Sequence, residues 1–396
     1  MPRPRWDERL AAAEAERRRG DAQRRRRVVE CAQGPRVVVD GRPLLQFCGN
    51  DYLGLAASAE AVRALCEAAT RHGLGSGGSA LVSGHHALHA AFEREAAEWL
   101  GYERALFFPS GYQANLAVLQ GLLQAGDLCV QDKWNHACLI DGARLAGAVL
   151  RRYPHADVEG ARRQLQSLPA AAALLATDGV FSMDGDLAPL PRLAALATEA
   201  QALLLVDEAH GIGVLGPEGR GAAAAAGLAA GEVPLLVVPL GKAFGAQGAL
   251  VLGSAALIEH LVQSARPYLF STAALPALAA ALTANLRALR AATEGRARLL
   301  ERVAQFREGA RRLGLPLHDS PGPIQPLKLG DNARALALAA ALERRGYWVA
   351  AIRPPSVPEG TARLRITLSA LHSAADVDGL LDALAASLPE VDGVAA

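Results

Sequence analysis

The sequence predicts an α/β protein. We expect a large domain with a mostly parallel central sheet flanked by helices, and a small α+β C-terminal domain. Between residues 105 and 252, seven apolar runs of about five residues alternate with helical stretches, which is typical of a parallel sheet covered by helices. From about residue 316 the pattern changes to an α+β one. The expected division is an N-terminal helix and hairpin segment over 1–47, the large domain over 48–285 and the small domain over 286–396.

The composition limits the class of protein. Of the 396 residues 51% are hydrophobic and 20% are charged, so a large core is expected and wholesale disorder is not. The net charge of +1 argues against a general nucleic-acid binder. Five cysteines without a Cys-x-x-Cys pair indicate reduced thiols, as in the cytoplasm, and neither a disulfide framework nor a zinc site. The longest apolar stretch, 221–241, is interrupted by Glu232 and two prolines, so no membrane span is expected.

The N-terminal thirty residues are rich in charge, with ten arginines and six acids. Those acids argue against a transit peptide. Trp6, Leu10 and Ala13 have helical spacing and predict a helix on the surface. The densest positive cluster is Arg24 to Arg27. Most of these arginines suit a solvated helix end; the alternative is a docking surface for an acidic partner or a substrate carboxylate.

Several short elements come before the alternating region. Residues 36–47 alternate as a hairpin around Asp40-Gly41, a pair typical of its turn. Helices are predicted over about 60–72 and 88–100. The glycine-rich stretch 73–79 between them cannot belong to a helix or a central strand. It is either a flexible linker or a loop whose backbone can approach a ligand.

Polar residues follow the apolar runs of the alternating region. In such a sheet, ligands bind at the carboxyl ends of the strands. Ser110 and Gly111 open a helix whose first N–H groups would suit an anion. Taken singly, these polar residues could be turn formers or helix caps, or a metal pair without a convincing third ligand. Besides Ser110 and Gly111, they are His136, Asp178, Ser182, Asp207, His210 and Lys242.

Lysine is rare in this chain, which has three lysines beside 38 arginines. Arginine stays protonated in proteins, whereas a desolvated lysine can lose its proton and act as a nucleophile. Lys133 suits a loop and Lys328 the solvent face of an edge strand. Lys242 follows a buried type of strand and is flanked by glycines, although on its own it could be a chance lysine in a turn. An anion site, a carboxylate and this lysine at one edge together suit pyridoxal phosphate (PLP).

The C-terminal part is predicted to begin with mainly helical structure over 255–313. Arg353 is followed by two prolines that hold its backbone rigidly, which makes it a better ligand candidate than most surface arginines. Strands are then predicted over 324–329, 347–351 and 363–368, and helices over 331–345 and 373–387.

Six motifs are distributed along the chain: Asn50–Gly54, Gly75–Ser79, Thr177–Asp186, Asp207–Gly211, Gly241-Lys242 and Ala351–Pro358. They resemble those of the α-oxoamine synthases, a family of fold-type I PLP-dependent transferases, and the resemblance covers nearly the whole chain. Within the family, Arg353–Pro358 and Leu81–Gly84 are most similar to the branch that joins L-alanine to a pimeloyl thioester in biotin biosynthesis.

The resemblance also implies roles for individual residues. Lys242 would form the Schiff base with PLP, Asp207 would pair with the pyridine nitrogen and His136 would stack on the ring, which makes these three the expected catalytic residues. His210 would bond the ring hydroxyl, and Ser182 the ring oxygen or the substrate. No metal is expected. The remaining predicted contacts are Gly111 and Tyr112 to the phosphate, Ser271 and Thr272 to the phosphate of the other subunit in a homodimer, and Asn50, Arg24 and Arg353 to substrate carboxylates.

The reaction implied is a decarboxylative condensation of L-alanine with a pimeloyl thioester, carried by acyl carrier protein (ACP) or coenzyme A (CoA). It releases carbon dioxide and the free carrier thiol. Enzymes of the 5-aminolevulinate synthase, glycine C-acetyltransferase and serine palmitoyltransferase types remain alternatives, because a pocket gains little discrimination from one methyl group. The non-enzyme alternative is an idle regulatory protein with a PLP fold.

One position departs from the family pattern. The family usually has a threonine three residues before the lysine, and this threonine donates to the phosphate. Here that position is Pro239, which has no hydrogen-bond donor. Either Ser271 or Thr272 compensates for the missing donor, or phosphate binding is weaker.

Overall fold

The computed structural model describes residues 5–394, which fall into two compact units. The large unit holds residues 50–182 and 186–298. The small unit holds the described residues up to 49, residues 183–185 and those from 299 onward. The sequence-based division set 1–47 apart, whereas the structure groups the described part of that segment with the C-terminal residues.

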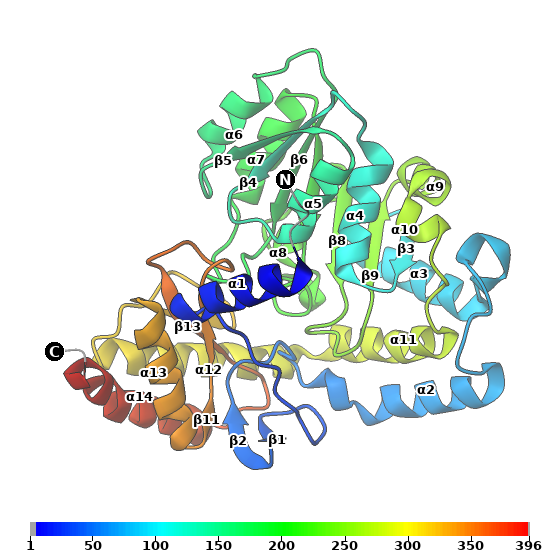
Figure 1. Ribbon diagram of the computed structural model, residues 1–396. Helices are drawn as coiled ribbons and strands as arrows, with labels where there is room; N and C mark the ends of the chain where they lie inside the picture. The colour runs from blue at the N-terminus through cyan, green and yellow to red at the C-terminus, as the bar shows by residue number, and fades with distance from the viewer. Residues whose placement is uncertain (1–4, 395–396) are drawn as a thin grey trace. The chain divides into compact units, whose positions relative to one another are not determined.

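The large unit contains a seven-stranded sheet with the order β3-β9-β8-β7-β6-β4-β5 (Figure 1). The pairs from β5 to β8 are parallel, and β9 runs antiparallel to both β8 and β3. The predicted mostly parallel sheet is confirmed, since each apolar run forms one of its strands. The strands are β3 (Arg104–Phe108), β4 (Leu128–Asp132), β5 (Val149–Tyr153), β6 (Ala173–Asp178), β7 (Leu203–Asp207), β8 (Leu235–Pro239) and β9 (Ala249–Gly253).

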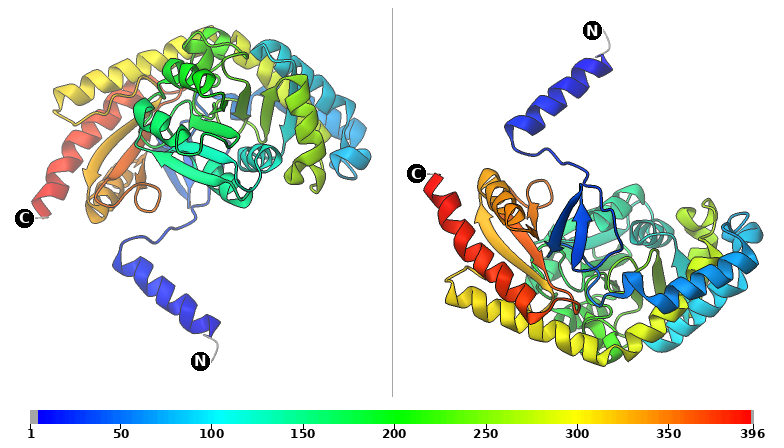
Figure 2. Two further views of the ribbon diagram at one scale, coloured as in Figure 1. Left: turned by 90° about the horizontal axis from the view of Figure 1, so that it is seen from above. Right: turned by 90° about the horizontal axis from the view of Figure 1, so that it is seen from below.

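Helices cover this sheet, and its strands other than the edge strand β5 are buried along nearly their whole length. On one face, Leu106, Leu174 and Val237 share a core with residues of α4, α5 and α9. In the same unit, α2 and α11 run side by side (Figures 1 and 2). The α-helices are α2 (Ala59–His72), α3 (Ala87–Leu100), α4 (Gly111–Leu122), α5 (Ala137–Leu145), α6 (Val158–Leu165), α7 (Leu190–Glu199), α8 (Ala222–Ala225), α9 (Ala255–Ser264), α10 (Arg266–Leu269), α11 (Pro276–Ala291) and the start of α12 (Thr293–Arg312).

Two loops of the large unit are held by close backbone contacts. The glycine-rich stretch 73–79 is an ordered loop: the Ser76 hydroxyl donates to the carbonyl of Ala273 at 2.8 Å. A short π-helical turn, Ala80–Gly84, follows it. The loop after β8 packs on residues 55–56, where a Cβ on Gly245 would lie 2.3 Å from backbone atoms. Because Gly245 also has a φ of +66°, only glycine fits there, and this contact fixes the loop that carries Lys242.

The small unit contains two three-stranded sheets, β1-β2-β11 and β10-β13-β12. The predicted hairpin is confirmed, with Asp40 and Gly41 at positive φ between its strands. The single strand predicted over 347–351 is two short strands that join different sheets. No helix in residues 5–394 is long and apolar enough to cross a membrane. The elements are α1 (Trp6–Arg19), β1 (Arg36–Val39), β2 (Arg42–Gln46), the rest of α12, β10 (Ile324–Gly330), α13 (Asn332–Arg344), β11 (Tyr347–Trp348), β12 (Ala350–Ile352), β13 (Ala362–Thr367) and α14 (Ala374–Val394).

Asp184 has a structural role in the small unit. It is 3% exposed, and its carboxylate pairs with Arg363 at 2.6 Å and with Lys328 at 3.0 Å. Asp184 is therefore not only a turn former, because it neutralises two cations of the β10-β13 pair. Lys328 does lie on an edge strand as predicted, and it is half-exposed.

Candidate active site

A cavity of about 320 Å³ lies in the large unit, at the carboxyl ends of the parallel strands. It gathers side chains from the segments after β3, β4, β6, β7 and β8. The structure thus brings together most of the predicted site. The predicted residues that line this cavity are Asn50, Gly111, Tyr112, His136, Ser182, Asp207, His210 and Lys242.

Asp207 is the last residue of β7 and is 4% exposed. Its Oδ2 accepts a hydrogen bond from Asn115 Nδ2 at 2.6 Å, and its Oδ1 accepts one from the backbone N–H of Ala209 at 2.9 Å. Two donors on opposite oxygens fix the plane of the carboxylate. Asp207 therefore presents a rigid negative group to the cavity.

Asp178 lies beside Asp207, in register with it across the β6-β7 pair. Its Oδ2 accepts the backbone N–H of His136 at 3.2 Å. Burial and the adjacent charge of Asp207 raise the pKa of Asp178 well above its usual range, although Lys242 opposes the shift. The cavity wall thus favours a protonated Asp178 over two neighbouring negative charges.

His210 is held by the tyrosine of the Asn50–Gly54 motif. The Tyr52 hydroxyl lies 2.7 Å from His210 Nδ1 and donates to Asn50 Oδ1 at 3.1 Å. Both rings are buried. The pair fixes the orientation of the imidazole at the cavity.

His136 is the N-cap of α5 and has one face open to the cavity. Its Nδ1 accepts the backbone N–H of Cys138 at 3.3 Å, and the thiol of Cys138 lies 2.9 Å from the same nitrogen. Burial against the wall lowers the pKa of His136, and the charge of Lys242 lowers it further while Asp207 opposes. The ring therefore favours its neutral form.

Lys242 is half-buried in the loop between β8 and β9. Its carbonyl accepts the N–H of Gly245 at 2.7 Å, and Leu240 N–H donates to Gly248 at 2.9 Å, so the loop is closed at its base. The loop therefore places a lysine amine at the cavity, and an amine is the group that forms a Schiff base.

The start of α4 forms the anion-binding part of the cavity. The Ser110 side chain accepts the N–H of Gln113 at 3.2 Å, which leaves the N–H groups of Gly111 and Tyr112 without helical partners. The hydroxyl of Tyr112 donates to Asp141. Pro239 lies against this helix start, because a Cβ on Gly111 would be 2.9 Å from the proline ring. Pro239 fills the space beside the anion site without offering a donor.

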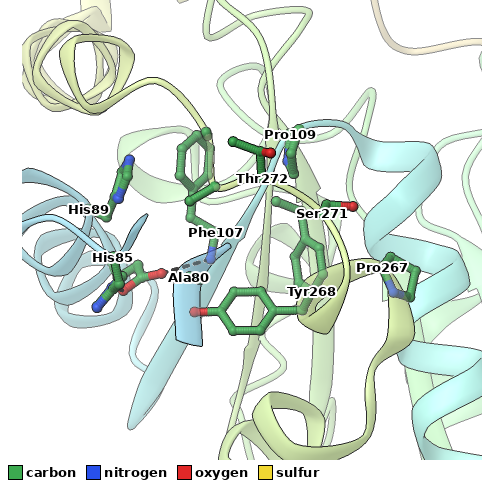
Figure 3. A pocket seen from close by; sticks show the side chains of 13 residues that line it. Ala80, His85, His89, Phe107, Pro109, Pro267, Tyr268, Ser271 and Thr272 are labelled. Carbon is green, nitrogen blue, oxygen red and sulfur yellow. Dashed lines mark hydrogen bonds and ion pairs between the residues drawn. The ribbon is translucent and has the colours of Figure 1, made fainter. Parts of the chain in front are cut away.

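Ser271 and Thr272 line a second, small cavity of the large unit, together with Tyr268 and Phe107 (Figure 3). They do not line the cavity that contains Lys242. Their predicted contact is with the phosphate of another subunit, so it stays a prediction.

Arg24 and Arg353 lie in the small unit, and each donates a hydrogen bond to a residue near the other in the sequence. Arg353 Nη2 donates to the carbonyl of Gln23 at 3.0 Å, and Arg24 Nη2 donates to the Ser356 hydroxyl at 3.2 Å. Burial and the nearby charge of Arg24 lower the pKa of Arg353. The two arginines hold the segment before the β1-β2 hairpin, and their contact with a substrate carboxylate stays a prediction.

Three side chains of the site are not among the residues predicted from the sequence: Tyr52, Asn115 and Cys138. Tyr52 belongs to the Asn50–Gly54 motif, in which only Asn50 is a predicted site residue. Asn115 could have been noticed as a polar residue among the apolar neighbours of a helix. Cys138 had no such signal, because a cysteine near a helix start usually packs as a small apolar residue. Within residues 5–394, no group of three or more His, Cys, Asp or Glu side chains is arranged to hold a metal ion.

A family model described as "Aminotransferase class I and II" matches residues 42–384. The 8-amino-7-oxononanoate synthase of Xylella fastidiosa (strain M12) is 55% identical over 388 residues, which cover 98% of this chain and 97% of that protein. Two solved structures are similar along most of their length. Serine palmitoyltransferase from S. paucimobilis with PLP and myriocin bound has a TM-score of 0.93 at 29% identity, and covers 98% of this chain and 100% of its own. The 8-amino-7-oxononanoate synthase of Francisella tularensis has a TM-score of 0.78 at 32% identity, and covers 89% and 99%.

Proposed function

We propose the following reaction for this chain from the family to which it belongs. It is a member of the class I and II aminotransferase family and, within it, of the 8-amino-7-oxononanoate synthases, which are PLP-dependent acyltransferases. It condenses L-alanine with a pimeloyl thioester to give 8-amino-7-oxononanoate, carbon dioxide and the free carrier thiol. The relatives named 8-amino-7-oxononanoate synthase support this branch of the family. The observation that supports the reaction most is that one cavity holds Lys242, Asp207, His136 and His210.

The chemistry of this cavity fits PLP. The fixed carboxylate of Asp207 suits a protonated pyridine nitrogen. The start of α4 offers N–H groups to the phosphate. Lys242 supplies the amine that would hold the cofactor covalently, and His210 would donate to or accept from its ring hydroxyl.

The residues of this chain would then have separate roles in the proposed condensation. When bound, PLP supplies an electron sink for the carbon next to the amino group of alanine. Asp207 would keep the proton on the pyridine nitrogen, so that the sink stays effective. Lys242 Nζ would remove the α-proton of alanine and later return a proton to the product. His136 would cover one face of the ring and exclude water, and Ser182 would orient the ring oxygen or the substrate.

We assign the substrate carboxylates to Asn50, Arg24 and Arg353. We also expect a cytoplasmic homodimer in which Ser271 and Thr272 of one subunit reach the phosphate held by the other. If these contacts do not replace the donor that Pro239 lacks, phosphate binding is weaker.

An arginine-lined surface of the small unit suits an acidic acyl carrier. Arg17 and Arg24 to Arg27 line a hollow of about 1010 Å³ in the small unit. Arg25 is 80% exposed although it lies 3.6 Å from Asp40, whereas Arg27 is more buried and pairs with Glu343. Exposed arginines of this kind would steer an acidic carrier such as ACP more strongly than the smaller CoA. Reversing the charges of Arg25 and Arg26 should then slow the ACP-dependent rate several-fold at low salt, and an unchanged rate would contradict this assignment.

The test of the reaction is the visible spectrum of the protein loaded with PLP, recorded during titration with L-alanine, glycine and L-serine. We expect a saturable change at the lowest concentration with alanine. Pimeloyl-CoA and pimeloyl-ACP are then added, and the product is identified by mass. A stronger response to glycine or serine would move the function to another member of the family, and the absence of a visible band would refute the assignment of Lys242.

A further inference from the structure

Cys138 is a buried residue for which the proposed reaction has no use. It is the second residue of α5, its side chain is 2% exposed, and it lines the cavity beside His136. Burial raises the pKa of its thiol, and the negative charge of Asp207 raises it further. Cys138 is therefore a protonated thiol that can donate one hydrogen bond, and it is not a nucleophilic thiolate.

The contacts of His136 define which ring nitrogen carries the proton. A backbone N–H can only donate, and the N–H of Cys138 points at His136 Nδ1 at 3.3 Å. That nitrogen is therefore an acceptor without a proton of its own. The thiol lies 2.9 Å from the same Nδ1 and is placed to donate to it as well. In the neutral ring the single N–H must be at Nε2.

The hydrogen bonds of Asn115 show that the Cys138 sulfur acts as an acceptor toward Asn115. Its Nδ2 group donates to Asp207 Oδ2 at 2.6 Å and to Cys138 Sγ at 3.1 Å. The carboxylate of Asp207 accepts only, so the amide nitrogen of Asn115 must face it. The same nitrogen faces the sulfur, which therefore accepts from Asn115 and has its own hydrogen left for Nδ1 of His136.

We propose that Cys138 is a positioning residue, which holds His136 neutral with its proton on Nε2 and links it through Asn115 to Asp207. A single network then orients both the carboxylate and the histidine that the proposed function uses. The consequence for the reaction rests on that function, whereas the state of the ring does not.

Several charged or titratable groups surround His136, and each bears on its protonation. Asp207 and Lys242 act from the ends of β7 and β8, and Asp141 acts from α5 itself. Asp178 accepts the backbone N–H of His136, and the ring of Tyr112 lies edge-on with its centroid at 6.4 Å. Among these groups, Cys138 is the one whose side chain bonds directly to Nδ1.

The experiment compares PLP-loaded wild type with Cys138→Ser and Cys138→Ala. Histidine labelled with ¹⁵N in the ring reports the tautomer and the pKa of His136 by NMR between pH 6 and 9, and loss of one signal pair in His136→Gln assigns it. Serine keeps a donor and an acceptor, so the wild-type signals should persist. Alanine removes a donor that stabilises the neutral ring, so the pKa of His136 should rise by about half a unit or more.

Matched controls separate this role from loss of a buried thiol. Cys129 is also buried, and its sulfur accepts from Gln131, on the same strand. Cys129→Ala should leave the signals of His136 unchanged. If Cys138→Ala does not fold, Cys138→Val has a similar volume, lacks the donor and takes its place.

An unchanged tautomer and pKa in Cys138→Ala or Cys138→Val would overturn the proposal, as would a wild-type ring protonated on Nδ1. The measurement needs no amino acid or thioester. A failure of the proposed function, seen as no spectral response to alanine, would therefore be distinguishable from a failure of this inference. In kinetics we expect the pH profile of kcat/KM to shift in the alanine variant and to return in the serine variant.

Discussion

Two histidines lie after neighbouring strands of the same sheet, and their surroundings are opposite. His155 is clamped by Asp132 at 3.1 Å and by Asp186 at 2.6 Å, and the ring of Trp134 stacks on it with centroids 3.8 Å apart. Burial alone would lower the pKa of His155, but the two carboxylates outweigh it and raise the pKa to about 9. His136 has one face open to the cavity and accepts hydrogen bonds at Nδ1, and its pKa is lowered.

The difference separates a structural histidine from a functional one. Around His155 both ring nitrogens are bonded to carboxylates and Trp134 stacks on the ring, so neither nitrogen remains to bind a ligand. Around His136 the neighbouring carboxylates are held by neutral donors, and the ring keeps a free face. A histidine near acidic residues therefore indicates a binding site only where its ring is not already bonded to their carboxylates.

The largest effect should come from the lysine of the cavity. Lys242→Ala should abolish turnover and the visible band of bound PLP, since no other lysine lines that cavity. Absorbance after reconstitution and product formation measure this. Lys133→Ala, which removes an exposed lysine after β4, is the control and should keep both; substantial activity in Lys242→Ala would sink the assignment.

Asp207→Asn should be the next most damaging change. It removes the charge that keeps the pyridine nitrogen protonated, at a cost of roughly 3 kcal/mol or more in transition-state stabilisation, or about a hundredfold in kcat/KM. Steady-state kinetics measure the loss. The matched change beside His155, Asp186→Asn, should leave the activity of the folded enzyme within a few-fold. Equal losses of activity in the two variants would contradict the assignment of different roles to the groups around His136 and His155.

The group of His155, Asp132 and Asp186 should contribute to stability and not to activity. The pKa of His155 is about 9 in the folded protein and 6.5 when unperturbed. Its contribution is therefore complete below pH 6.5 and is lost as the pH rises through 9. We expect His155→Gln to lower the free energy of unfolding by about 2 kcal/mol at pH 6, after allowance for solvent screening, and by much less above pH 9.

Urea unfolding of wild type and His155→Gln at pH 6 and at pH 9.5 tests this expectation. His260→Gln, at an exposed position on α9, serves as the control and should show no such dependence. A stability difference that stays the same at both pH values would show that packing, and not the ion pairs, accounts for the effect.

The smallest effect concerns the cavity's anion site. Pro239→Thr would place a hydroxyl beside the start of α4, and one added hydrogen bond of about 1 kcal/mol should tighten PLP binding about fivefold. The dissociation constant from fluorescence titration measures it. Pro239→Ala lacks the hydroxyl and should bind as the wild type does. Equal constants for threonine and proline would mean that other donors already satisfy the phosphate.

Much of this fold could be predicted because the sheet is buried on both faces, so that most of its strands are largely apolar, as Leu203–Asp207 is. Asp207 could be predicted because it lies at the carboxyl end of such a strand, and Lys242 because it is one of three lysines and follows a buried strand. The break between β11 and β12 could not, since it depends on which sheet each short strand joins. Asn115 and Cys138 were missed because their roles depend on which atom faces Asp207 or His136, and spacing alone does not determine that.

The scarcity of lysine has a practical consequence for handling the protein. Amine-directed reagents attack unprotonated, accessible lysines, and the three in this chain differ sharply in that respect. Lys242 is half-buried in the cavity, and Lys328 is paired with Asp184 at 3.0 Å. Lys133 is exposed after β4. A dye, a tether or a solid support that couples to lysine side chains should therefore attach mainly at Lys133, so that immobilised molecules share one orientation.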